Sequence, residues 1–216
     1  MTEDHKTLEA RLDRMESIAA IRQLAFKYAV AVDMRDMDAI VNLYVTDAKV
    51  SEHARGRQAL KRVFAEVLRT FTSSVHHVGN HIVEFDDADN AHGLVYCRCE
   101  HEIGAVWLPM YLYYLDIYKR VDGIWYIKRR APCELYGVAT TDAPVGPDKV
   151  RWPGRPPHDG TWHKHFPSWQ EYWASAAPGE DPVKPEAPPD KFLDTMRRGE
   201  RRVFPMNFDW AKNQAR

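Results

Sequence analysis

The chain has 216 residues, of which 44% are hydrophobic and 28% are charged. This composition is ordinary for a globular protein, and the formal net charge of -1 provides no field that would attract nucleic acid or an anionic membrane. The sequence contains no run of about 18 apolar residues, so we expect no transmembrane helix. The polar N-terminus lacks the apolar core of a signal peptide. We therefore expect a cytoplasmic protein that binds neither nucleic acid nor membrane.

The first third of the chain predicts helices. No Gly or Pro interrupts residues 4–34, and apolar residues recur at spacings of three and four between Ile18 and Val32, which is typical of an amphipathic helix. The expected elements here are a helix over residues 4–34, a second helix from Met37 to Tyr44 with Asp36 as its N-cap, a short strand from Ala48 to Ser51, and a third helix after Gly56.

From residue 76 onward the apolar period changes to two, which predicts strands. The pair Asp122 and Gly123 is a strong hairpin signal between two such segments. Helices followed by antiparallel strands indicate an α+β fold with the helices on one face of a curved sheet. The expected strands are His76 to Phe85, Ala91 to Ile103, Val106 to Val121, and a last strand that ends near Cys133 or Leu135.

The composition changes in the final seventy residues. They hold eleven of the fourteen prolines and five of the seven tryptophans. Prolines disfavour a packed domain, whereas disordered segments are depleted in aromatic residues. We predict a core domain over residues 1–140 and an extended arm over residues 141–216, which packs on the core or on a neighbouring subunit. Pro167 to Ser175 and Pro189 to Arg198 are expected to form short helices.

Three histidines, His76, His77 and His81, lie within six residues. Histidine is the usual proton carrier near neutral pH. Strand alternation puts His76 and Asn80 on one face and the other two histidines on the opposite face. A pair of histidines that meets an aspartate in one pocket would form an acid–base site, because the carboxylate fixes the tautomer and the imidazole moves a proton.

Cys97, Cys99 and His101 would share one face of the next strand. Such a set could bind a soft metal ion with one coordination position open, but buried thiols in a core are more common, and we expect no metal. The odd number of cysteines, three, does not indicate a disulfide framework. No Gly-rich phosphate loop or G-x-S-x-G elbow is present, so we expect neither a nucleotide cofactor nor a serine nucleophile.

Three stretches carry a family resemblance. They read Tyr-Ala-Val-Ala-Val-Asp-Met-Arg-Asp-Met-Asp-Ala-Ile at 28–40, His-His-Val-Gly-Asn at 76–80, and Tyr-Leu-Asp-Ile-Tyr-Lys-Arg-Val-Asp-Gly-Ile-Trp-Tyr-Ile at 114–127. Over residues 5 to about 138 the chain resembles the SnoaL-like branch of the NTF2-like superfamily and, within it, the scytalone dehydratases. The resemblance implies a cone, in which a bent antiparallel sheet wraps around N-terminal helices and encloses a deep pocket, with no metal or organic cofactor.

The resemblance also implies a catalytic set. Asp33 matches the catalytic aspartate of the dehydratases, and His76 and His101 match their two catalytic histidines. Tyr28 matches a tyrosine that bile-acid dehydratases of the same fold place five residues before the aspartate.

The substrate contacts depart from that pattern. Glu52, Leu112 and Tyr114 stand where the scytalone dehydratases have a tyrosine, a serine and an asparagine. An aromatic strand and its neighbours would suit a hydrophobic ligand. The side chains that we expect to contact the substrate are Tyr96, Trp107, Leu112, Tyr114, Glu52 and Asn80.

Together these features predict a cofactor-independent lyase that acts on a hydroxylated, hydrophobic, aromatic small molecule in the catabolism of aromatic compounds. The reaction is a dehydration, or a dehydroxylation coupled to loss of formaldehyde, as in the diarylpropane lyases that act on lignin-derived dimers. The alternatives are an isomerase or polyketide-type cyclase with Asp33 as base, and a non-catalytic NTF2-like binding module. A homo-oligomer is expected, with a trimer favoured over a dimer because trimers occur in the dehydratase branch.

Overall fold

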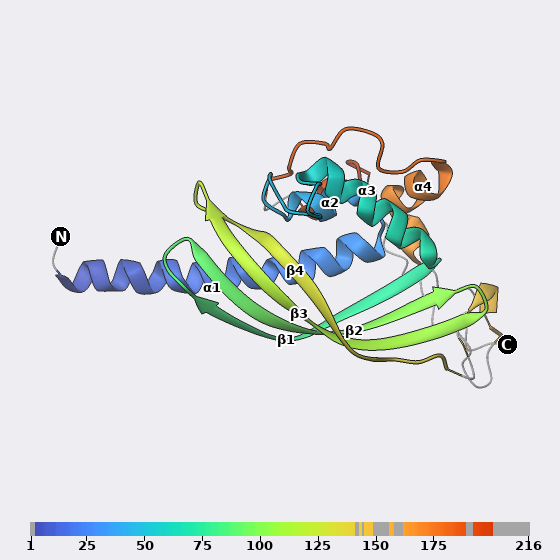
Figure 1. The fold of residues 1–216 in the computed structure, drawn as a ribbon, viewed down its shortest axis with the longest axis horizontal. Coiled ribbons are helices and arrows are strands. Elements are labelled where there is room, and N and C mark those ends of the chain that lie inside the picture. The colour runs from blue at the N-terminus through green and yellow to red at the C-terminus, as the bar shows by residue number, and fades with distance from the viewer. Residues whose placement is uncertain are drawn as a thin grey trace, which may run out of the picture.

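The computed structural model describes residues 3–140, 143, 145–148, 156–157, 162–188 and 192–200. A long helix, two shorter helices and a run of strands come first, and small helices follow in the arm (Figure 1). The helices are α1 (Glu3–Asp33), α2 (Met37–Asn42), α3 (Arg57–Val67), α4 (Pro167–Ala174) and α5 (Phe192–Met196), with 3-10 turns η1 (Leu68–Thr70), η2 (Gly146–Asp148) and η3 (Trp162–His165). The strands are β1 (Ser73–Phe85), β2 (Asn90–Ile103), β3 (Val106–Val121) and β4 (Ile124–Gly137).

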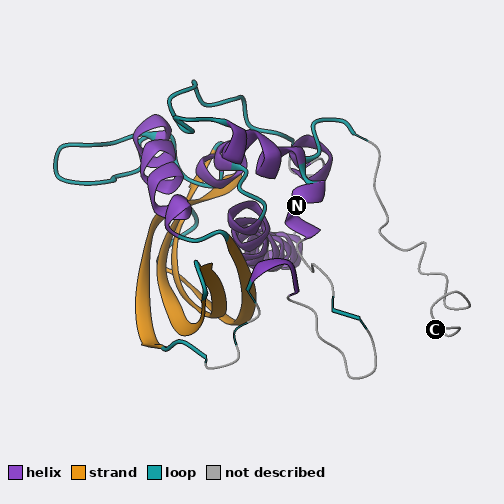
Figure 2. Cartoon of the chain, turned by 90° about the vertical axis from the view of Figure 1, so that its right-hand side faces the viewer, coloured by secondary structure: helices purple, strands orange, loops and turns teal. Residues whose placement is uncertain are grey.

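The predicted α+β fold is confirmed. The four strands pair in the order β1-β2-β3-β4, and each pair is antiparallel. The sheet curves around α1, which lies along its concave side, while α2 and α3 lie at one edge of the curve (Figures 1 and 2). The core is therefore enclosed between the inward face of the sheet and the buried stripe of α1, which includes Ile21, Ala25 and Val32.

The end of α1 is set by its last turn. Arg35 adopts a left-handed φ of 58°, which is unfavourable for a non-glycine residue and ends the helical run. Asp36 then caps α2 as predicted, since its Oδ1 accepts a 2.9 Å hydrogen bond from the backbone N–H of Ala39. Although α1 is 31 residues long, no helix among the described residues has the length and apolarity needed to cross a membrane.

The turn between β3 and β4 has the expected form. Asp122 and Gly123 both have positive φ, 50° and 81°, as a two-residue type I′ hairpin requires. The short strand predicted from Ala48 to Ser51 is wrong: only an isolated bridge between Lys49 and Arg55 forms there. The backbone N–H groups of residues 50 and 51 both bond to the carbonyl of Ala54, so the segment closes on itself as a tight loop.

The described parts of the arm pack on the core of the same chain. Both short helices predicted for the arm form, the first over Pro167–Ala174 and the second over Phe192–Met196. Residues 189–191, which the second prediction included, lie outside the described residues. In α4, the Tyr172 hydroxyl donates to the carbonyl of Ala65 over 2.6 Å, and the Ser168 hydroxyl donates to the carbonyl of Met34 over 2.7 Å. The arm therefore covers α3 and the end of α1.

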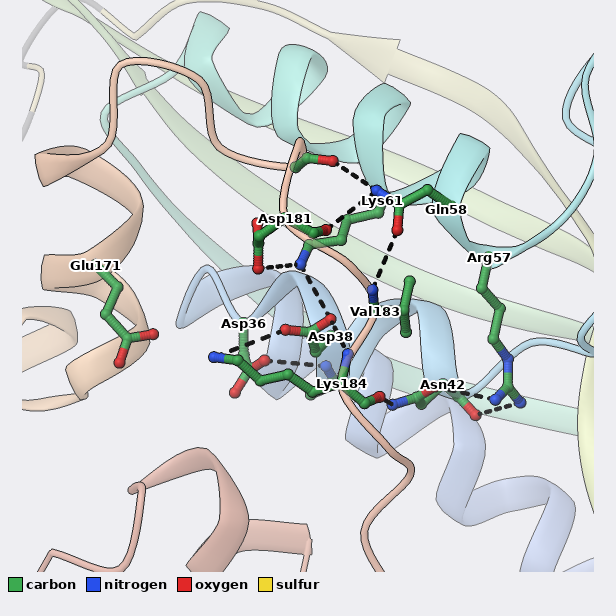
Figure 3. A network of polar contacts seen from close by, with 12 residues as sticks. Asp36, Asp38, Asn42, Arg57, Gln58, Lys61, Glu171, Asp181, Val183 and Lys184 are labelled. Carbon is green, nitrogen blue, oxygen red and sulfur yellow. Dashed lines mark hydrogen bonds and ion pairs between the residues drawn. The ribbon is translucent and has the colours of Figure 1, made fainter.

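Residues 179–187, which we call the strap, run across α2 and α3 (Figure 3). Gln58 bonds to the strap three times, through the carbonyls of residues 179 and 181 and the N–H of Val183. Lys61 is buried and pairs with Asp38 on α2 at 3.1 Å and with Asp181 on the strap at 2.7 Å. Because a buried charge is costly without partners, this pair of carboxylates fixes the strap against the helices.

Candidate active site

The end of α1 and the start of β1 bring an aspartate and a histidine into direct contact. Oδ1 of Asp33 lies 2.6 Å from Nδ1 of His76. Oδ2 of the same carboxylate accepts a 2.8 Å hydrogen bond from the backbone N–H of His76. The His76 side chain is 7% exposed and that of Asp33 is 10% exposed. The carboxylate thus fixes the ring through Nδ1, and the ring also hydrogen-bonds to the Cys99 side chain, so Nε2 is the ring nitrogen that is not committed to Asp33.

Ser74 and Arg35 hold the aspartate in place. The Ser74 hydroxyl donates to Asp33 Oδ1 over 2.8 Å, and Arg35 Nη1 donates to that hydroxyl over 3.0 Å. The guanidinium also bonds to the backbone carbonyls of Val32 and Phe71, and Arg35 is only 1% exposed. Sequence reasoning missed both residues. The one available signal was an arginine between two aspartates directly after the helix.

The pKa values of His76 and His101 diverge. Burial by itself lowers the pKa of His76, but the charge and hydrogen bond of Asp33 override it and raise the pKa to about 10. Burial, together with the nearby charge of His76, lowers the pKa of His101 to about 4. The two rings lie 6.0 Å apart at right angles. At neutral pH the site therefore holds an imidazolium beside a neutral imidazole, the arrangement by which acid and base roles separate.

Cys97 and Cys99 lie next to this pair without forming a metal site. Their sulfurs are 3.6 Å apart, and both side chains are buried. The Cys97 thiol and burial raise the pKa of the Cys99 thiol, so it stays protonated and is a poor metal ligand or nucleophile. No group of three or more potential metal ligands gathers anywhere in the part of the chain that the structure describes.

Tyr28, the fourth residue of the predicted catalytic set, packs against Tyr114 and Arg130 inside the cone. Its ring contacts Tyr114, with centroids 5.8 Å apart, and the Arg130 guanidinium lies 4.4 Å from the centroid of each of these two rings. Burial raises the pKa of Tyr28 to about 12. Leu112 and Tyr114 are buried on this inward face, as expected of wall residues. Tyr28 thus belongs to the floor of the cone behind the histidines, and no hydrogen bond joins it to Asp33 in the described part of the chain.

The prediction that His81 faces away from His76 is wrong. The pairing of β1 with β2 runs from Val78 opposite Cys97 to His81 opposite Val95, so β1 holds one extra residue there. Such a β-bulge reverses the alternation of the strand beyond it. His81 therefore turns inward, and its Nε2 lies 3.0 Å from the Tyr118 hydroxyl. A glycine inside a strand pattern, Gly79, was the signal that could have revealed the bulge.

The bulge places His81 at the end of a buried polar network. The Tyr118 hydroxyl donates to Asp116 Oδ2 over 2.7 Å, and Arg130 bonds to both oxygens of the same carboxylate, at 2.8 and 2.5 Å. Burial lowers the pKa of His81 to about 4. The network neutralises the Arg130 charge at the floor of the cone and keeps its guanidinium against the two tyrosine rings.

Four predicted contact residues lie away from the histidines. Tyr96 packs on Tyr113, with ring centroids 6.0 Å apart. The two residues are cross-strand partners on the convex face of the sheet. Trp107 occupies the same face, where its Nε1 donates to Glu100 over 2.8 Å. Glu52 is exposed in the loop before α3, and Asn80 is exposed in the bulge. Strand alternation and the loop geometry therefore exclude these side chains from the wall that carries His76.

The arm reaches the catalytic candidates from outside. Nε2 of His163 lies 2.9 Å from the carbonyl oxygen of Ser74. The Trp169 ring packs on the His163 ring, with centroids 4.9 Å apart. The Arg35 guanidinium lies 5.2 Å from the centre of the Trp169 ring. The arm thus shields the hydrogen bonds that hold Asp33 from water, which strengthens them.

A protein-family model described as the SnoaL-like domain matches residues 13–131 of the chain, which is more than half of it. That range includes α1 from Asp13 onward, the sheet up to Ala131 and all of the side chains that surround Asp33 within the core. No curated protein matches the chain significantly.

Solved structures with the same fold include a protein assigned as a scytalone dehydratase from Novosphingobium aromaticivorans. It is 25% identical, with a TM-score of 0.53 over 59% of this chain and 90% of that one. The hexachlorocyclohexane dehydrochlorinase LinA-type3 from Novosphingobium barchaimii is 25% identical, with a TM-score of 0.55 over 61% of this chain and 95% of that one. A type 2 form of this dehydrochlorinase has a TM-score of 0.59 over 65% of this chain and 99% of that one, at 23% identity.

Proposed function

We propose that this chain, which belongs to the SnoaL-like family, is a lyase that uses the Asp33–His76 pair for acid–base catalysis without a metal or organic cofactor. Its substrate is a hydroxylated, hydrophobic, aromatic small molecule. The observation that carries the proposal is the 2.6 Å contact between His76 Nδ1 and Asp33 Oδ1, because it keeps a charged proton donor ready in a buried site.

Two of the solved structures support this reaction class. Both are 25% identical to the chain and both carry names that describe an elimination, one as a dehydratase and one as a dehydrochlorinase. An elimination from a benzylic alcohol needs a proton for the departing hydroxyl group and a base for the proton lost from carbon. A single histidine can do both in turn if it starts protonated.

In the proposed reaction, the His76 imidazolium gives its Nε2 proton to the benzylic hydroxyl, and the carbon–oxygen bond breaks to release water. The ring of the substrate stabilises the cation that forms. His76 is now neutral and strongly basic because Asp33 holds its other nitrogen. It takes the proton from the adjacent carbon, the electron pair of that bond forms the alkene, and the starting protonation state returns. His101 stays neutral and accepts a hydrogen bond from the substrate.

The same first step serves a diarylpropane diol. After water leaves, neutral His76 takes the proton of the primary hydroxyl, the carbon–carbon bond breaks, and formaldehyde and an alkene form. This variant suits a pathway for the breakdown of aromatic compounds. The homo-oligomer with a preferred trimer and the division at residue 140 stay predictions.

The alternative in which Asp33 itself is the base, as in an isomerase or cyclase, receives less support from the geometry. Both carboxylate oxygens already accept hydrogen bonds from Ser74 and His76. A carboxylate with its lone pairs committed in this way is a weak base towards a substrate carbon. The contact itself also favours an enzyme over a binding module, because binding alone needs no acid–base pair.

The test is turnover of 1,2-diarylpropane-1,3-diols and of simple benzylic alcohols, followed by the absorbance of the conjugated product and by a formaldehyde assay. Positioned acid–base catalysis is worth roughly 10²–10⁴-fold, so His76→Gln should lose at least about 100-fold. His77→Gln is the matched control, because His77 is the next residue and is exposed on the opposite face. Equal rates for the two variants would refute the assignment.

The pH profile separates the proton donor from a simple base. If His76 must start protonated, the rate stays level from neutral pH to about 9 and falls as the pH passes its pKa of about 10. A histidine that must start neutral would give the opposite result, with the rate rising over the same range. A rising profile would therefore overturn the proposed sequence of steps.

A further inference from the structure

A cavity lies between α1, α2, the β3–β4 turn with the start of β4, the strap and α5. Its volume is about 530 Å³, within the range of roughly 300–1,000 Å³ that small-molecule sites occupy. Neither Asp33, His76 nor His101 is among the residues that line it. The cavity is therefore separate from the proposed catalytic pair, and its role does not depend on the lyase activity.

The walls of this cavity are mostly apolar. Leu24 of α1 and Leu43 after α2 form one side, Ile124 and Trp125 of β4 form another, and Met196 of α5 forms a third. Trp125 and Met196 are 5% and 1% exposed, so these walls are fixed by packing in the core. Such walls suit the body of an aromatic or branched aliphatic molecule.

The carboxylates on the cavity wall already have cationic partners. Asp36 pairs with Arg198 at 2.7 Å, and Asp38 pairs with Lys61 at 3.1 Å. Glu186 of the strap accepts a 3.0 Å hydrogen bond from the Tyr126 hydroxyl and lies 3.6 Å from Arg57. Figure 3 shows Asp38 held between Lys61 of α3 and Lys184 of the strap, with Asp36 at the start of α2.

Lys27 is the exception. It is half-buried, its Nζ lies 5.4 Å from the centre of the Phe192 ring, and no carboxylate of the described residues lies within ion-pair distance of it. Burial lowers the pKa of Lys27, although Glu186 partly compensates. An ammonium group that lines an apolar cavity without an ion-pair partner is costly, and an anionic ligand would remove that cost.

We propose that this cavity is a second binding site for a small aromatic or branched aliphatic monocarboxylic acid, whose carboxylate pairs with Lys27 while its body packs against Leu24, Trp125 and Met196. The charge of the ligand is limited to one, because Lys27 is the single wall cation lacking a carboxylate in the described part of the chain. A dianion such as a phosphate monoester would also meet the repulsion of Asp36, Asp38 and Glu186.

The test is isothermal titration of the full chain with 3-phenylpropionate and with its neutral analogue, 3-phenylpropionamide. The acid should bind more tightly than the amide, and Lys27→Met should weaken the acid by about tenfold or more, since a charge-assisted contact is lost. Lys27→Arg should keep most of the affinity. Lys128→Met, an exposed lysine of β4, is the matched control and should change nothing.

Two further variants locate the ligand. Ala39→Phe projects a ring into the cavity from α2 and should abolish binding of the acid, whereas His76→Gln should leave it intact. Thermal unfolding of each variant reports whether it is folded. The proposal fails if the wild-type chain binds acid and amide equally or binds neither. It also fails if Lys27→Met matches Lys128→Met, or if His76→Gln removes binding, since the acid would then occupy the proposed catalytic site.

Discussion

Replacing Asp33 by asparagine isolates the interaction on which the proposed chemistry depends. Asp33 raises the pKa of His76 from the ordinary 6.5 to about 10, a difference worth about 5 kcal/mol at about 1.4 kcal/mol per pH unit. Burial works against this rise, so in Asp33→Asn burial is opposed only by the smaller contribution of Cys99. The pKa of His76 should then fall below 6.5, and the ring should be neutral at pH 7.5.

The change can be measured by NMR from the histidine Cε1–H resonances, with His76→Gln used to assign the signal. In the wild-type chain the His76 resonance should stay at its protonated position from pH 5 to 9. In Asp33→Asn it should titrate below pH 6.5. The exposed Asp47→Asn is the matched control and should reproduce the wild-type curve. A wild-type midpoint near 6.5, or an unchanged midpoint in Asp33→Asn, would refute the electrostatic reasoning.

Two further substitutions test the surroundings of the pair and the attachment of the arm. Ser74→Ala removes the 2.8 Å hydrogen bond to Asp33. Such a bond contributes about 1 kcal/mol, so its loss should lower kcat by several-fold with KM little changed. An unchanged kcat would show that the serine does not position the carboxylate. Gly179→Ala should lower the free energy of unfolding by about 1–3 kcal/mol, because Gly179 has a φ of 98° and a new Cβ would lie 2.9 Å from the Cβ of Ala65. Gly199→Ala, at a φ of 77° in open space, controls for backbone strain alone, and equal costs in chemical denaturation would show that the contact with α3 does not matter.

Much of the fold could be predicted because its signals are local. The apolar stripe of α1 between Ile18 and Val32, the Asp36 cap and the Asp122–Gly123 turn each act within a few residues. The strand faces of β2 and β3 also follow from alternation alone. That rule already separates Tyr96 from Cys97, so the exclusion of Tyr96 from the wall was within reach of the sequence.

The site could be predicted only in part, because its geometry depends on contacts between distant segments. Asp33 and His76 are 43 positions apart, and a family resemblance, rather than periodicity, linked them. Arg35 could not be found, since an arginine after a helix is ordinarily solvated. It becomes buried here because Ser74, Trp169 and two backbone carbonyls enclose it, and the arm that contributes Trp169 follows more than 130 residues later.

The β-bulge gives β1 two halves that are out of phase with each other. Before it, the positions of His76 and Val78 point inward, and after it those of His81 and Val83 do so. One extra residue thus lets a single strand deliver an even-numbered position to the acid–base pair and odd-numbered positions to the floor of the cone. The residues of the acid–base pair and those of the floor of the cone therefore follow two different alternation patterns along one strand. A deletion of Asn80 would remove the bulge, so that only one of the two sets of side chains could still point inward.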